Sequence, residues 1–270
     1  MKTRILKTVA LSAALGCANF CTGFSVVFHG ADNARYCGYA EFVTRSETIN
    51  YSRKETSEYK IKSEVPDYYR MASNTSCANI AGAVVIGYYD RFCEELIPDY
   101  KAYYQIGSGI MYKSGGTYAE QVMNLLYTLM GTDVGGAGTT FDGFHAGMKS
   151  YANGHGYSYL TEDMGNIDFN KYKTAVEANK PVAIFLSAFS FQITGSNDGA
   201  TETIKNDYCT TGHVVVGYGY KVDTYYNANN QVITTRTYLK VASGLETYKM
   251  AYLCLDGKSN VSRATAITIQ

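Results

Sequence analysis

The sequence Cys77-Ala78-Asn79-Ile80-Ala81-Gly82-Ala83-Val84-Val85-Ile86-Gly87-Tyr88-Tyr89-Asp90 decides the fold of this 270-residue chain. It places a cysteine at the start of a run of small and apolar residues, which predicts a central helix over residues 78–92. Its alanines and glycines allow a neighbouring sheet to approach closely. A thiol at a helix N-terminus lies where the helix dipole and the backbone N–H groups favour the thiolate. Cys77 is therefore a candidate nucleophile.

A second segment, Gly212-His213-Val214-Val215-Val216-Gly217-Tyr218, begins the C-terminal part of the chain. It predicts a buried strand over residues 214–220, with a histidine directly before its first residue. An imidazole fixed on a rigid strand can accept a proton from a thiol and return it to a leaving group. His213 follows Cys77 by 136 residues, and this distance is typical of one class of thiol hydrolases.

The segments around these two motifs predict helices first and antiparallel strands last. The pattern predicts helices at 117–130, 141–152 and 170–178, loops at 131–140 and 195–207, and strands at 182–189, 232–241, 250–255 and 264–269. Asparagine-rich residues 227–230 favour a hairpin turn. This order predicts an α+β fold, with an N-terminal helical half packed on a C-terminal antiparallel sheet.

The two motifs resemble those of a known family. Residues 76–90 are similar to the helix of the C39-like cysteine peptidases, which commonly reads Cys-Gly-Pro, seven residues, Gly-Tyr-Tyr-Asp, and residues 212–218 are similar to that family's histidine strand. The resemblance covers about residues 65–255. It implies a papain-like cysteine proteinase fold, peptide-bond cleavage by a Cys77–His213 pair, no metal and no organic cofactor.

Three positions depart from the family pattern. The Gly-Pro after the nucleophile is Ala78-Asn79, and the oxyanion-binding glutamine falls at Met71, which cannot donate a hydrogen bond. No Asp or Asn occurs in residues 238–244, where the third catalytic residue is expected.

Other groups can fill these roles. Asn74 or Ser73, with the Cys77 amide, can bind the oxyanion, and Ser243, Asp223 or a backbone carbonyl can orient the imidazole. The departures leave two alternatives to the peptidase: a weak or inactive binding protein on the same scaffold, and an acyl transferase that uses the same cysteine.

The N-terminus has the three-part form of a secretory signal peptide. Lys2, Arg4 and Lys7 precede a short apolar run, and small residues follow around Cys17. We therefore predict a signal peptide at 1–22, an N-terminal extension of strands or propeptide remnant at 23–64, and the peptidase domain at 65–270. An uncleaved anchor and a lipid-modified Cys17 are alternatives. The expected location is extracellular or on the cell surface.

Export changes the interpretation of the cysteines. With Cys17 and Cys21 in the leader and Cys77 as nucleophile, an even set remains: Cys37, Cys93, Cys209 and Cys254. These four can form two disulfides outside the cell, in any of three pairings; the alternative for Cys93 is a buried small hydrophobe. The formal net charge is zero, which argues against nucleic acid as partner. We expect a monomer that acts on a peptide or protein.

Overall fold

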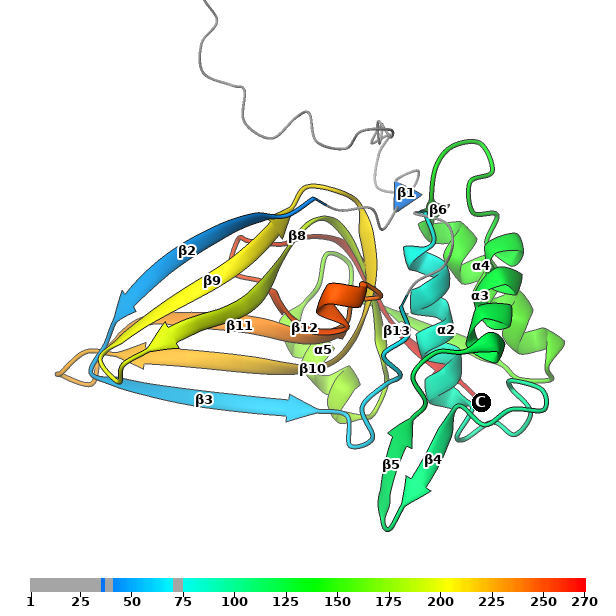
Figure 1. Cartoon of the computed structure of the whole chain (residues 1–270), viewed down its shortest axis with the longest axis horizontal. Coiled ribbons are helices and arrows are strands. Elements are labelled where there is room, and N and C mark those ends of the chain that lie inside the picture. Colours follow the sequence, from blue (N-terminus) through cyan, green and yellow to red (C-terminus); the bar gives the residue numbers. More distant parts are fainter. Residues whose placement is uncertain (1–34, 37–40, 70–74) are drawn as a thin grey trace, which may run out of the picture.

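The computed structural model of the protein describes residues 35–36, 41–69 and 75–270. Strands hold 43% of the described residues and helices 23%. The predicted helix-rich, papain-like α+β arrangement is therefore wrong. A large antiparallel sheet dominates the molecule, and three of the helices gather at one end of it (Figure 1). The reason is that several polar segments predicted as loops or extensions are strands.

The elements follow the chain in this order. The helices are α2 (Cys77–Tyr89), α3 (Thr117–Leu129), α4 (Phe141–Gly154), α5 (Phe169–Glu177) and the short 3-10 helix η1 (Glu246–Tyr248). The strands are β1 (Arg35–Tyr36), β2 (Val43–Asn50), β3 (Arg53–Lys60), β4 (Tyr103–Ile106), β5 (Gly109–Tyr112), β6 (Thr139–Thr140), β7 (Tyr159–Asp163), β8 (Val182–Asn197), β9 (Thr201–Cys209), β10 (His213–Tyr226), β11 (Val232–Ala242), β12 (Met250–Cys254) and β13 (Asn260–Ile269).

The main sheet has nine strands. Seven follow the order β2-β9-β8-β12-β11-β10-β3; β13 pairs with β8, and β7 pairs with β13. The first part of β8 also pairs with β10, so that the path β8-β12-β11-β10 returns to its start. The sheet therefore closes on itself. We call the part formed by β2, β3 and β8 to β12 the β lobe; it extends away from the helices in Figure 1.

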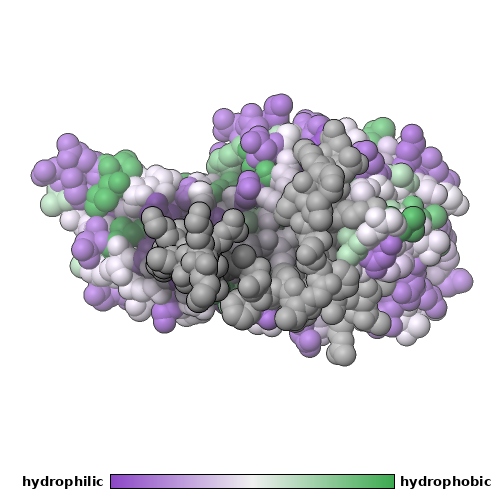
Figure 2. All heavy atoms as spheres, turned by 90° about the horizontal axis from the view of Figure 1, so that it is seen from above, coloured by the Kyte–Doolittle hydropathy of each residue, from purple (hydrophilic) through white to green (hydrophobic). Residues whose placement is uncertain are grey.

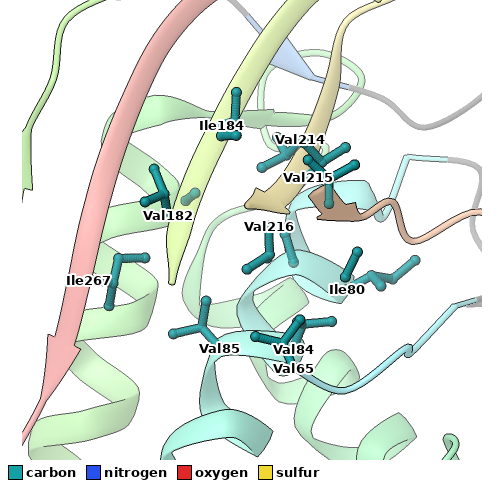
Figure 3. Packing of buried hydrophobic residues seen from close by; sticks show 14 of the residues in the cluster. Val65, Ile80, Val84, Val85, Val182, Ile184, Val214, Val215, Val216 and Ile267 are labelled. Carbon is teal, nitrogen blue, oxygen red and sulfur yellow. The ribbon is translucent and has the colours of Figure 1, made fainter. Parts of the chain in front are cut away.

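Helix α2 is the centre of the hydrophobic core. Every one of its residues is buried. Ile80, Val84 and Val85 lie beside the apolar residues of β10, β8 and β13 (Figure 3). On another side, a Cβ atom at Gly82 would lie 2.8 Å from Leu126 of α3. The small residues of α2 therefore let a sheet and a helix pack against it. The sequence predicted the approach of the sheet; the contact with α3 is an addition.

The interior of the β lobe is polar, and this explains the largest error in the predicted elements. Residues 195–207 were expected to form a loop, but β8 continues to Asn197 and β9 begins at Thr201. Inside the lobe, Lys54 forms ion pairs with Glu202 and with Asp223, which is only 1% exposed. Because charged and hydroxyl-bearing side chains face inward here, these strands lack the apolar alternation that identifies strands in a sequence.

The N-terminal extension is part of the sheet over residues 43–60. Strand β2 pairs with β9, and β3 pairs with β10. The extended segment expected at residues 24–28 lies outside the described residues. Residues 43–60 thus add strands to the main sheet, and the boundary expected at residue 64 does not divide the sheet.

The face in Figure 2 shows hydrophobic residues only in small, separate spots among hydrophilic ones, outside the grey part. No helix in the described residues has the length and apolar character needed to cross a membrane.

Candidate active site

Cys77 is the first residue of α2 and is 3% exposed. Ser76, the residue before it, does not cap the helix with its side chain. The positive end of the helix dipole lies at the region of the thiol. This placement agrees with the position predicted from the sequence.

Residues 131–140 hold the chain just before Cys77. Asp133 Oδ2 accepts a hydrogen bond from Thr75 Oγ1 at 2.6 Å, and Asp133 Oδ1 accepts one from the Gly138 amide at 2.5 Å. Tyr127 also donates to this carboxylate. The sequence predicted a loop here, and the Asp133 carboxylate joins this loop to the residue two positions before α2. The feature of the sequence that could have indicated this role is an acidic residue, Asp133, within a glycine-rich segment.

Asn79 extends the same network on the first turn of α2. It is fully buried, and its Nδ2 donates to Thr132 Oγ1 at 3.0 Å. The hydroxyl of Thr132 in turn lies 2.6 Å from that of Thr139. Asn79 stands where the C39-like pattern has proline, so the departure brings a side chain that fixes the loop against the helix.

His213 is the first residue of β10 and is 1% exposed. Its Nε2 lies 2.8 Å from the carbonyl oxygen of Ser243, which can only accept, so Nε2 carries the proton. Nδ1 is then the bare acceptor nitrogen, and it has no hydrogen-bond partner in the described part of the chain. Phe189 stacks on the ring at a centroid distance of 5.0 Å. The ring is held with one nitrogen able to take a proton.

Helix α2 packs against β10, and the turn after β11 reaches the first part of α2. The turn that holds His213 through Ser243 continues into Gly244, where an added Cβ would lie 3.2 Å from Ile80 Cγ2. Ile80 lies about one helical turn after Cys77. Gly244 has φ +73°, a conformation that favours glycine at this close approach. Ile80, one turn after Cys77, therefore packs against the turn whose carbonyl holds the His213 ring. His213 Nδ1 makes no hydrogen bond to Cys77 or to any other residue that the structure describes.

The other predicted site residues lie in different places. Ser243 is beside His213, but it holds the ring through its carbonyl, while its Oγ donates to the carbonyl of Tyr248 at 2.6 Å. Asp223 lies ten residues further along β10, roughly 30 Å from its start. Asn74, Ser73 and Met71 lie outside the described residues.

The cysteines in the described residues form no disulfide. Cys77, Cys93, Cys209 and Cys254 are all buried, and Cys37 lies outside the described residues. Burial raises the pKa of the Cys93 thiol, and it raises the pKa of Cys254 to about 12. Cys93 and Cys254 are therefore protonated, weakly nucleophilic thiols at neutral pH.

Burial lowers the pKa of His213 to about 4, although the bond to the Ser243 carbonyl opposes this change. As the pH falls, His213 takes up a proton in the unfolded chain near pH 6.5, but in the folded protein only near pH 4. The folded state therefore keeps its full stability above pH 6.5, and the contribution of the neutral His213 ring is lost as the pH falls towards 4. We expect the free energy of unfolding to fall by about 3 kcal/mol over that window through His213.

Urea unfolding at several pH values measures this loss, and ¹⁵N NMR of the imidazole reports the His213 ring itself. The ring is expected to stay neutral down to about pH 5. A ring that titrates near 6.5 in the folded protein would contradict the expectation.

No known protein family matches this chain, and no curated protein is similar to it in sequence.

Proposed function

We propose that this protein is a thiol hydrolase that cleaves peptide bonds, with Cys77 as nucleophile and His213 as proton acceptor. One observation carries the proposal: the turn at Ser243 and Gly244 contacts the first part of α2 and holds the His213 ring with Nδ1 as its acceptor nitrogen. The C39-like character of the two motifs supports the same assignment of roles.

The chemistry requires no other reacting group. As the Cys77 sulfur forms a bond to the carbonyl carbon, its proton passes to His213 Nδ1, and the carbonyl oxygen becomes an oxyanion. Backbone N–H groups at the start of α2 can donate to that oxygen. His213 then gives the proton to the departing amine as the C–N bond breaks. Water hydrolyses the thioester, again with His213 as base.

The low pKa of His213 determines how this proton moves. A neutral imidazole at pH 7 does not hold a preformed ion pair with the thiolate, so proton transfer must accompany the attack on the carbonyl. The same low pKa makes the protonated ring a strong acid towards the leaving amine. The substrate in this proposal is a peptide or protein that the exported protein meets outside the cell.

A second candidate function is a binding protein with a weak or inactive site. The burial of both Cys77 and His213 favours it, together with the bond from His213 to a carbonyl instead of a carboxylate or amide. A carbonyl orients the ring, but it stabilises the imidazolium less than a carboxylate does. Reactivity of the thiol in the folded protein separates the two candidates.

Labelling with iodoacetamide, followed by mass spectrometry of the peptides, makes this measurement. The hydrolase predicts one rapid modification per folded chain, at Cys77, with little at Cys93, Cys209 and Cys254. These three buried thiols serve as internal controls, because all of them should react after denaturation in urea. A Cys77 that reacts only after denaturation would favour the binding protein.

A further inference from the structure

A polar recess opens in the β lobe, on β2, β9 and β8 and beside the turn after β12. Its volume is about 280 Å³, and it is lined by Arg45, Ser46, Glu47, Ser190, Asn206, Tyr208, Gly257 and Lys258. We call it the Asn206 recess.

Strand register explains why these side chains meet. Arg45 lies directly opposite Asn206 across β2 and β9, and Ser190 lies opposite Tyr208 across β8 and β9. Paired residues project to the same face of a sheet, and their neighbours along the strand project to the other face. Phe189, next to Ser190, therefore points the other way, and it stacks on His213. The recess lies on the opposite face of β8 from His213.

Two largely buried polar side chains line the recess and keep donors that no other residue uses. Asn206 is 3% exposed and Ser190 is 2% exposed. The Cys254 thiol, protonated because burial raises its pKa, donates to Asn206 Oδ1 at 3.0 Å. This bond fixes the amide with Nδ2 on the side away from the thiol. In the described part of the chain, no hydrogen bond joins this Nδ2 or Ser190 Oγ to another residue, and neither atom belongs to the fully buried polar atoms that lack a partner. Both atoms are therefore accessible from the recess and free to donate to a group bound there.

The charges in the recess favour an anion. The Glu47 carboxylate is already bound by Arg236, at 3.0 Å from Nε, and by Lys258, at 2.5 Å. Burial alone would raise the Glu47 pKa, but these two cations lower it, so the group stays ionised. Arg45 stacks on the Tyr208 ring at 4.2 Å and has no carboxylate partner among the described residues. The recess thus offers donors and positive charge, while its one carboxylate is already neutralised.

We propose that the Asn206 recess binds a small oxyanion, a carboxylate or a phosphate group. Arg45 and Lys258 supply the positive charge, and Asn206 Nδ2 and Ser190 Oγ supply hydrogen bonds from the buried wall. The volume suits a molecule of about the size of an amino acid. Because these residues lie across the sheet from His213, the site is independent of peptide hydrolysis at Cys77.

Isothermal titration of the full chain tests the proposal, with inorganic phosphate and succinate as separate ligands at one fixed ionic strength. At least one of them should bind with a Kd of about 1 mM or below. Tighter binding of succinate would assign the site to carboxylates, and tighter binding of phosphate to phosphates. R45Q and N206D should each weaken that binding at least about tenfold, because each removes a charge-assisted or buried donor.

The matched control is R53Q. Arg53 also stacks on a tyrosine of the β lobe, Tyr226, at 3.8 Å, but it lies outside the recess. The R53Q variant should bind phosphate and succinate as tightly as the unmodified protein does. The proposal would be overturned if neither phosphate nor succinate bound at about 10 mM. It would also be overturned if R45Q and N206D bound the ligand as tightly as the unmodified protein, or if the unmodified protein bound neutral glucose as tightly as the anions.

Discussion

Cys77→Ala is expected to lower kcat/KM for peptide hydrolysis by about 10⁴-fold or more. Loss of the nucleophile removes the covalent step, and the residual rate then comes only from substrate binding and oxyanion stabilisation. Release of fluorescence from a mixture of quenched peptides, in the full chain and in the chain from residue 41 onward, measures the change.

Cys93→Ala is the matched control for this substitution. Cys93 is buried like Cys77 and lies just beyond the other end of α2. Its thiol lies 3.5 Å from the carbonyl of Ile269, so its loss tests packing and not chemistry. Hydrolysis by Cys93→Ala should stay within about twofold of the unmodified rate. Equal rates for Cys77→Ala and the unmodified chain would refute the proposed nucleophile.

Asp223→Ala is expected to lower the free energy of unfolding by about 3–5 kcal/mol. The Asp223 carboxylate is buried inside the β lobe, where Oδ2 lies 3.1 Å from Lys54 Nζ and 3.4 Å from Lys221 Nζ. Oδ1 accepts from Thr56 at 2.7 Å. Removal of the carboxylate leaves two ammonium groups with one fewer neutralising partner in a poorly solvated space, and that loss is costly.

Glu55→Ala provides the comparison, because Glu55 lies on the same strand as Thr56 but is exposed and paired with Arg53. Urea unfolding followed by circular dichroism should show a lower midpoint for Asp223→Ala and no measurable change for Glu55→Ala. Similar midpoints for the two variants would show that the ion pairs inside the lobe contribute little to stability.

The sequence predicted the helices well, because their signals are local. Apolar periodicity located α3 and α4 to within two residues at each end. The run of small residues identified α2 as buried on all sides. Both motif residues, Cys77 and His213, stand at the starts of their elements, as predicted.

The fold class was wrong because the β lobe has a charged interior. A strand such as β9, with Glu202, Asn206 and Asp207 in its sequence, resembles a surface loop when only hydropathy is considered. Glu202 is paired with Lys54 of β3, and Asp207 accepts a hydrogen bond from Thr44 of β2. These partners are distant in the sequence, so no local pattern shows that the charges are satisfied.

The detail of the candidate site depended on backbone geometry. The sequence left Ser243, Asp223 and a backbone carbonyl as groups that could orient the imidazole, and the structure shows that the carbonyl of Ser243 holds it. Every residue has a carbonyl, so the sequence could not show which one has this role. The role of Asp133 likewise comes from a carboxylate that joins the chain before Cys77 to a distant loop.

The position of β2 and β3 has a consequence for synthesis of the protein. Thr56 and Asp223, which are hydrogen-bonded, stand 167 positions apart in the chain. During translation, β2 and β3 are synthesised long before β9 and β10, the strands with which they pair. Such long-range pairing is slow. The nascent chain therefore exposes these unpaired segments to chaperones for much of translation, and assembly of the lobe comes late.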